Sequence, residues 1–206
     1  MTGQLSRYLE SEEGFLALEG DRNVDPCAVI VPFGLESSVS YGSGTCRGPD
    51  AIVAASHQVE LFDERRWREA IWDYGVATMA AFPLADSIPA ALEQLDGIVD
   101  GILRSGRFPM VLGGEHSITA GAIRPFARRF DRVSVLHFDA YYRDLSHLQP
   151  SAREQANFDH PDSLEHELFV EHLDGLLAGR PARVPTYDFA THSRLEEVDV
   201  VPPAPL

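Results

Sequence analysis

Lysine is absent from this chain of 206 residues, and all 17 basic residues are arginine. A phosphate-binding loop of the GxxxxGK[ST] kind needs a lysine that reaches the β and γ phosphates, so this sequence excludes such a loop. Cysteine is scarce, and Cys27 and Cys46 lack CxxC spacing, so we expect two reduced thiols. No apolar run could span a bilayer and no signal core is recognisable, so we expect a cytoplasmic protein without a membrane partner.

Positive charge is also in deficit, because the formal net charge is -15. Binding to nucleic acid or to anionic lipid requires clustered positive charge, so the sequence excludes both as partners. The charge favours a small cationic substrate. With 44% hydrophobic residues the chain is rich enough in apolar side chains to build a core.

Apolar runs alternate with amphipathic segments over the first two thirds of the chain. This alternation predicts an α/β fold with a mainly parallel sheet. The expected strands cover residues 26–33, 70–77, 108–114 and 133–138. The first expected helix begins near Pro49 and carries Ile52, Ser56, Val59 and Phe62 at helical spacing. The second begins at Ser87 and ends at Gly106. The third begins at Ser117 and should be kinked at Pro125.

The composition changes near residue 140, where the chain becomes polar and rich in turns. One amphipathic helix follows, ended by Gly179, and then the short strand-like run 184–189. We therefore expect a helix and a hairpin-like segment after the parallel sheet.

Two polar segments, LGGEHSIT (112–119) and LHFDA (136–140), follow neighbouring predicted strands. Parallel strands lie about 4.8 Å apart, so His116 and Asp139 could share one metal ion, with Mn, Zn or Fe(II) as the natural choices. Alternatively, His116 caps the helix at Ser117 and Asp139 accepts hydrogen bonds in a turn. We expect His137, in the strand itself, to be a buried core residue.

These segments, together with PFGLESSVSYGSGTCRGPDAIVAASHQVELFDE and VSVLHFDA, resemble the first half of an agmatinase-type ureohydrolase of the arginase superfamily, over residues 26–139. The resemblance implies a three-layer α/β/α fold. It also implies hydrolysis of agmatine or a related guanidino compound, with release of urea at a two-manganese centre. There, two cations would lower the pKa of a bridging water. His116 and Asp139 match two of the family's metal ligands, and Asp139 is the expected catalytic residue.

The sequence departs from the family after Asp139. The family has the pattern D-x-H-x-D, whereas this chain has Tyr141 and Arg143 at the second and third ligand positions. Asp144 could replace the third ligand if the backbone bulges by one residue. The family's later S-x-D-x-D-x-x-D-P stretch does not occur, so we expect an incomplete Mn²⁺ site and weak or no activity.

The stretches DAYYRDLSHL, NFDHPDSL, LLAGRPARVPTYDFATHSR and VDVVPPAP resemble a second family, the uridine kinases, over residues 139–205. That resemblance implies that Asp139 is a general base, with ATP and Mg²⁺ as cofactors only under this alternative. It also implies a pyrimidine nucleoside held by Tyr142, Phe158, Tyr187 and His192. An ordinary surface segment whose aromatic side chains fill a small core is the competing interpretation.

We therefore predict two parts, a ureohydrolase-like half over residues 1–139 and a kinase-like segment without a P-loop over 140–206. A guanidino hydrolase is the first hypothesis, a nucleoside-binding kinase relative the second, and a non-catalytic chimeric protein the third. A half sheet leaves an exposed edge and an uncovered apolar face, so we also expect a homo-oligomer.

Overall fold

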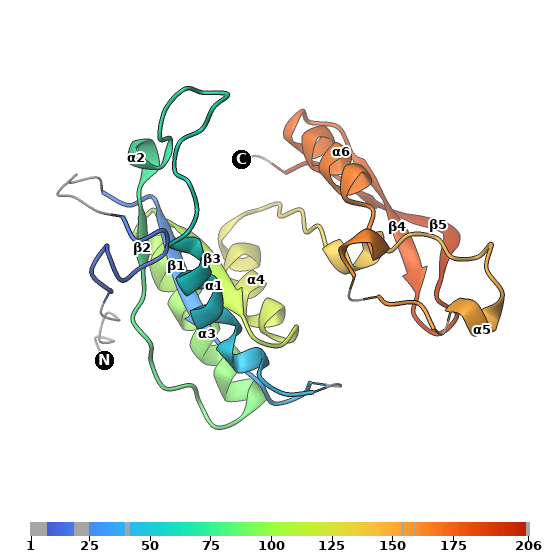
Figure 1. The fold of residues 1–206 in the computed structure, drawn as a ribbon, viewed down its shortest axis with the longest axis horizontal. Helices are drawn as coiled ribbons and strands as arrows, with labels where there is room; N and C mark the ends of the chain where they lie inside the picture. The colour runs from blue at the N-terminus through green and yellow to red at the C-terminus, as the bar shows by residue number, and fades with distance from the viewer. Residues whose placement is uncertain (1–7, 19–24, 40–41, 154, 159, 205–206) are drawn as a thin grey trace. The chain divides into compact units, whose positions relative to one another are not determined.

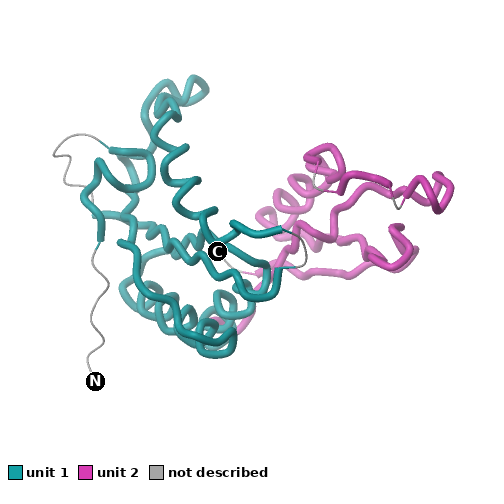
Figure 2. The backbone as a smooth tube through the Cα atoms, turned by 60° about the horizontal axis from the view of Figure 1, so that its bottom comes forward, with its two compact units in different colours: residues 1–129 teal, residues 130–206 magenta. Residues whose placement is uncertain are grey.

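The computed structural model describes residues 8–18, 25–39, 42–153, 155–158 and 160–204. The chain forms two compact units, residues 1–129 and 130–206 (Figure 2). This division falls ten residues before the seam that the sequence predicts between 139 and 140. Among the described residues, no helix is both long and apolar enough to cross a membrane.

The first unit is built on a three-stranded parallel sheet with the strand order β2-β1-β3 (Figure 1). In the register of this sheet Ala28 pairs with Val76 on one side and with Phe108 on the other. The strands are β1 (Ala28–Phe33), β2 (Val76–Thr78) and β3 (Phe108–Gly113). The helices are η1 (Thr45–Arg47), α1 (Gly48–Ser56), α2 (Ile71–Tyr74), α3 (Ile88–Arg104) and α4 (Ile118–Arg129).

β1 lies at the centre of the core because its side chains are buried on both faces, as the sequence predicts. Val29, Val31 and Phe33 point to one face and pack with the apolar stripe of α3. On the other face Ile30 is fully buried, and α1 contacts both β1 and β3. Helices thus lie on both faces of the sheet, although Phe108 and Met110 of the edge strand β3 stay exposed. The predicted α/β class with a parallel sheet is confirmed.

The longest helix, α3, begins and ends where the sequence predicts. The Ser87 side chain accepts a hydrogen bond from the backbone N–H of Ala90 at 3.4 Å, which caps the first turn. Gly106, with φ of 76°, ends the helix in the left-handed conformation that glycine tolerates.

Three sequence predictions are wrong in detail. Residues 71–74 form the single turn α2, ended by Gly75 at φ 60°, so only 76–78 is a strand there. Helix α1 ends at Ser56, and Val59 and Phe62 lie beyond it with exposed side chains. Residues 133–138 form no strand, because Leu136 and Phe138 pack instead into the core of the second unit.

The second unit combines one amphipathic helix with an antiparallel hairpin, as the sequence predicts. Its core centres on Tyr141, Ala182 and Val184, against which Phe169 and Leu176 of the helix pack. Its elements are η2 (Phe138–Tyr141), α5 (Pro150–Arg153), η3 (Pro161–Ser163), α6 (His166–Leu177), β4 (Ala182–Asp188) and β5 (Ser193–Val201).

Candidate functional site

The glycine pair at the end of β3, Gly113 and Gly114, lets two backbone segments approach closely. A Cβ atom on Gly114 would lie only 2.1 Å from the carbonyl oxygen of Leu35, so no larger residue fits there without movement. The N–H of Gly114 donates to Phe33 O at 3.2 Å, and the N–H of Glu115 donates to Leu35 O at 2.8 Å. The loop that carries His116 is therefore fastened to the end of β1.

Glu115 is a buried carboxylate that the sequence analysis missed. It accepts hydrogen bonds from the backbone N–H groups of Ser37 (2.5 Å) and Ser38 (2.6 Å), and from the hydroxyls of Ser38 (2.8 Å) and Ser117 (2.6 Å). The Ser117 hydroxyl first, and then the Ser37 and Ser38 donors, lower the pKa of Glu115 to about 2 against the opposing effect of burial. The sequence did offer one signal for Glu115, because this acidic residue stands between the glycine turn and Ser117.

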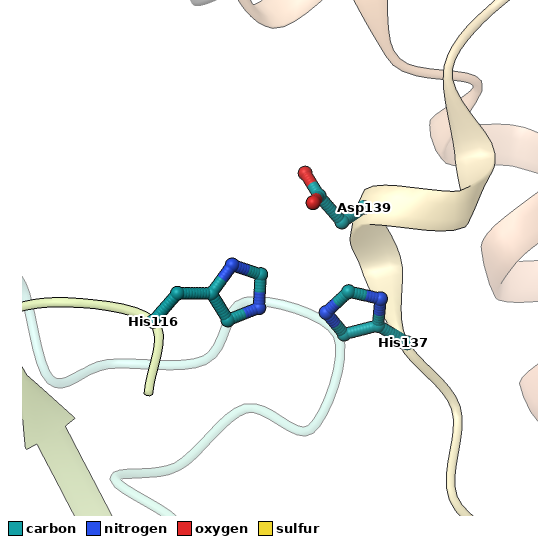
Figure 3. A group of neighbouring side chains, drawn as sticks. All are labelled: His116, His137 and Asp139. Carbon is teal, nitrogen blue, oxygen red and sulfur yellow. The ribbon is translucent and has the colours of Figure 1, made fainter. Parts of the chain in front are cut away.

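His116 follows Glu115 in the turn before α4, and its side chain is exposed. The helix begins at Ile118, one residue later than expected. Figure 3 shows His116 on this segment, His137 just before η2, and Asp139 within η2. The first unit thus supplies an imidazole at the carboxyl end of β3, where the sequence places it.

Within the second unit, His137 and Asp139 offer ligand atoms that lie within 4.8 Å of each other. The expectation that His137 is a buried core residue is wrong, because its side chain is exposed, while Asp139 is half-buried. An imidazole nitrogen beside a carboxylate oxygen suits Mn, Zn or Fe(II). This pair is a candidate His/Asp metal-binding group.

The two residues at the further ligand positions of the arginase pattern have structural partners in the second unit. Tyr141 is fully buried, its hydroxyl lies 2.9 Å from Nδ1 of His172, and burial raises its pKa to about 12. The Arg143 guanidinium donates to the backbone oxygen of Asp162 at 3.0 Å and lies 3.6 Å from the Glu167 carboxylate. A phenol held neutral and a guanidinium do not fit a two-metal site as ligands.

Asp144, the proposed replacement ligand, has hydrogen-bond partners of its own. Its carboxylate accepts from the hydroxyl (2.6 Å) and the N–H (3.0 Å) of Ser146, and from the N–H of Arg194 at 3.4 Å. The Ser146 donors are the main reason why the pKa of Asp144 is lowered. Among the described residues Asp144 belongs to no group of three or more potential metal ligands.

The four predicted nucleoside residues come together in one aromatic cluster. The ring of Tyr142 lies 5.5 Å from Phe158 and 5.2 Å from Tyr187, and Phe158 stacks on His192 at 4.6 Å with an interplanar angle of 23°. Phe189, which the sequence analysis did not select, lies 5.2 Å from Tyr187. Its i+2 spacing from Tyr187 was the signal, because alternate residues of a strand share a face.

Tyr187 is only 7% exposed, and its buried hydroxyl has no hydrogen-bond partner among the residues that the structure describes. An unsatisfied buried hydroxyl costs about 1–3 kcal/mol, so it is an uncommon feature of a folded core. A cavity of about 290 Å³ lies beside it in the same unit, lined by Ala140, Phe189 and Asp199 among others.

The backbone around the cluster is held by Arg194. Its guanidinium donates to Tyr142 O at 2.8 Å and pairs with the Glu165 carboxylate at 2.6 Å. His192 adopts φ of 51°, a left-handed conformation that is uncommon for a residue with a side chain. These contacts fix the hairpin turn that carries His192 next to Phe158.

The first unit is an α/β unit with a parallel sheet, and it carries an imidazole at the carboxyl end of β3. A sequence model of the Arginase family matches residues 27–160, more than half of the chain, and the chain belongs to this family. Solved structures share the fold. A hypothetical agmatinase from Burkholderia thailandensis aligns at 23% identity and TM-score 0.53, over 81% of this chain and 50% of that one. A putative agmatinase from Clostridium difficile aligns at 19% and 0.51, over 56% and 42%.

Curated relatives point to a second likeness. A uridine kinase of Chloroflexus aurantiacus is 42% identical over 98 residues, 47% of each chain. One of Aliivibrio fischeri is 44% identical over 72 residues, 35% of this chain and 34% of the relative. The chain therefore spans less than half the length of these relatives. An alignment of 98 residues is longer than the 67 residues of 140–206, so this likeness also reaches upstream of Asp139.

Proposed function

We propose that this chain is an Arginase-family hydrolase of the guanidino C–N bond whose metal centre is incomplete. Urea release from agmatine or a related guanidino compound would then be weak or absent. The proposed ligands are His116 and Asp139, which the sequence predicts, together with His137. Asp144, the third predicted ligand, would first have to give up its hydrogen bonds from Ser146. Mn²⁺ is the proposed ion, because imidazole and carboxylate ligands suit it and the family implies it. A cytoplasmic location is also part of the proposal and rests on the sequence alone.

The observation that supports incompleteness is the engagement of Tyr141 and Arg143. Tyr141 is buried with its hydroxyl on His172, and Arg143 binds Asp162 and Glu167. Without an imidazole and a carboxylate at these positions, a second cation has too few anionic or neutral donors to replace its water shell. A single ion lowers the pKa of bound water less than two ions together, so little hydroxide would form at neutral pH.

Urea release from agmatine with added Mn²⁺ tests this function. We expect at most slow turnover, abolished by His116→Ala and unchanged by His147→Ala, an exposed histidine outside the proposed ligand set. Turnover that survives His116→Ala would contradict the role of His116. Fast turnover by the unaltered chain would contradict the incomplete centre.

A second candidate function is binding of a pyrimidine nucleoside by the second unit, without phosphoryl transfer from ATP. The unpartnered hydroxyl of Tyr187 within the aromatic cluster favours it, because a base could stack on the rings and hydrogen-bond to that hydroxyl. The chain has no lysine-bearing phosphate loop, and phosphoryl transfer depends on positioning and neutralising the phosphates. Binding without turnover is therefore what we propose.

Thermal unfolding with uridine or cytidine tests this second candidate. A ligand that binds only the folded chain raises the melting temperature by mass action. We expect the rise to be lost in Phe158→Ala and kept in Phe130→Ala, since Phe130 is half-exposed and does not belong to the aromatic cluster. A rise that is equal in both variants would contradict binding at this cluster.

A further inference from the structure

The second unit contains a small cavity of about 290 Å³. It is lined by residues of the segment 135–140 and of the hairpin that β4 and β5 form. Sites for small molecules commonly measure roughly 300–1,000 Å³, so this cavity lies at the lower end of their range. A ligand that fits it is therefore a small molecule rather than a peptide or a dinucleotide.

Most of the cavity wall is apolar or aromatic. Val184 and Pro185 line it and are buried, and Val201 lines it from the neighbouring strand. Tyr187 and Phe189 add two aromatic rings, edge to face, with 5.2 Å between their centroids. The pairing of β4 with β5 shifts its register between Pro185 and Tyr187, and bulges of this kind re-aim side chains and are frequent beside active sites. The wall is thus built on the paired strands of the hairpin.

One carboxylate, that of Asp199, stands in this wall. Asp199 pairs with Val184 across the hairpin, and opposed residues of an antiparallel pair project to the same face, so Asp199 lies on the face that carries the core. No ion pair or side-chain hydrogen bond within the described part of the chain involves Asp199. No arginine is among the described residues that line the cavity, and His137 is the other lining residue that can carry charge near neutral pH. The cavity therefore places a carboxylate without a cationic partner beside apolar surface.

We propose that this cavity binds a small quaternary ammonium ion. Aromatic rings attract organic cations, and quaternary ammonium groups are the ligands most often recognised in this way. Asp199 would supply the opposite charge, while the methyl groups of the ligand would contact Val184 and Val201. A primary ammonium is less suited, because its three N–H donors need acceptors and the wall is mostly apolar. The net charge of -15 also favours a cationic ligand over an anionic one.

This site differs from the two sites proposed above. Phe158 and His192, which stack on each other in the aromatic cluster, do not line the cavity. The lining includes His137 but not Asp139, so the binding measurements are made with EDTA present to remove any metal ion. The inference therefore does not depend on urea release or on nucleoside binding.

Isothermal titration with choline tests the site, and the uncharged carbon isostere 3,3-dimethylbutan-1-ol is the control ligand. The two molecules have nearly the same shape, so a difference between their affinities measures the contribution of the positive charge. We expect choline to bind about tenfold more tightly or better, because the carboxylate and the aromatic rings both favour the cation. Equal affinities, or a choline titration without saturable binding, would overturn the proposal.

Two matched variants of β5 test the role of Asp199. Asp199→Asn removes the carboxylate of the cavity, and Glu196→Gln removes a negative charge from an exposed residue of the same strand that does not line the cavity. We expect Asp199→Asn to weaken choline binding about tenfold and Glu196→Gln to leave it unchanged. Equal choline affinities in the two variants would contradict the proposal.

The location of the bound ion can be checked in the unaltered chain. We expect nuclear Overhauser contacts between the methyl protons of choline and the methyl groups of Val184 and Val201, which line the cavity on its two strands. Contacts found only with other parts of the chain would overturn the assignment to this cavity.

Discussion

The hydroxyl of Tyr141 lies 2.9 Å from Nδ1 of His172, inside the core of the second unit. Tyr141 occupies the position at which the arginase pattern has a metal-binding histidine. Its ring also packs edge-on against Phe169, with 5.1 Å between centroids. The residue that would have to change to complete a metal centre is therefore one that this unit needs for its packing.

Restoring the family pattern should strengthen metal binding and lower the stability of the fold. We expect Tyr141→His with Arg143→Asp to raise Mn²⁺ affinity, because an imidazole and a carboxylate would replace a phenol and a guanidinium. The same change removes a fully buried ring and should lower the free energy of unfolding by about 2–4 kcal/mol. Isothermal titration with Mn²⁺ and urea unfolding measure the two effects. Tyr141→Phe, which keeps the ring, is the control and should cost about 1 kcal/mol without any gain in affinity.

Glu115 should make the first unit sensitive to acid. Its pKa is lowered from 4.5 in the unfolded chain to about 2 in the folded one. The stability that this difference supplies is fully present above pH 4.5 and is lost as the pH falls towards 2. We expect Glu115→Gln to lower the free energy of unfolding by about 2 kcal/mol at pH 7, with a difference that shrinks to nothing near pH 2. Glu93→Gln, an exposed change on α3, is the control, and an equal loss at both pH values would contradict the assignment.

Gly114 and Gly97 should respond to alanine in opposite directions. A Cβ on Gly114 would meet the backbone oxygen of Leu35 at 2.1 Å, so Gly114→Ala should separate the His116 loop from β1 and cost several kcal/mol. Nothing lies within 4 Å of a Cβ on Gly97 in the middle of α3, so Gly97→Ala should stabilise by about 0.5–1 kcal/mol. Thermal unfolding of the two variants measures both effects. Similar melting temperatures would show that the close approach of the two loops does not constrain the fold.

Removing the Tyr187 hydroxyl separates stability from binding. In the absence of ligand, Tyr187→Phe should be neutral or stabilising by up to about 1 kcal/mol, because the lost hydroxyl had no partner. If a nucleoside uses this hydroxyl, the variant should show a smaller rise in melting temperature with uridine than the unaltered chain. A variant that is clearly less stable without ligand would mean that the hydroxyl has a partner after all.

The sequence predicts those parts of the fold that depend on local pattern. β1, α3 and β3 appear where expected, because a buried apolar run, a Ser87 cap and a terminal Gly106 act within a few residues of the backbone they shape. The candidate residues around Phe158 and Tyr187 also converge, although only a resemblance predicted this.

The failures at residues 133–138 and at Glu115 share one cause, which is that both depend on contacts between residues far apart in the sequence. Residues 133–138 alternate as a strand does, yet Leu136 and Phe138 pack in the second unit and the Ser134 hydroxyl donates to Pro202 O. A local sequence pattern does not show which part of the chain a β-branched run will pack against. Glu115 was missed for the same reason, since its donors Ser37 and Ser38 lie 78 and 77 residues away.

The manganese content of the purified chain after loading with Mn²⁺ and dialysis tests the central claim most directly. We predict fewer than two ions per chain and little or no urea from agmatine, because Tyr141 and Arg143 supply no ligand for a second ion. Two tightly held manganese ions per chain, with urea release that His116→Ala abolishes, would contradict it.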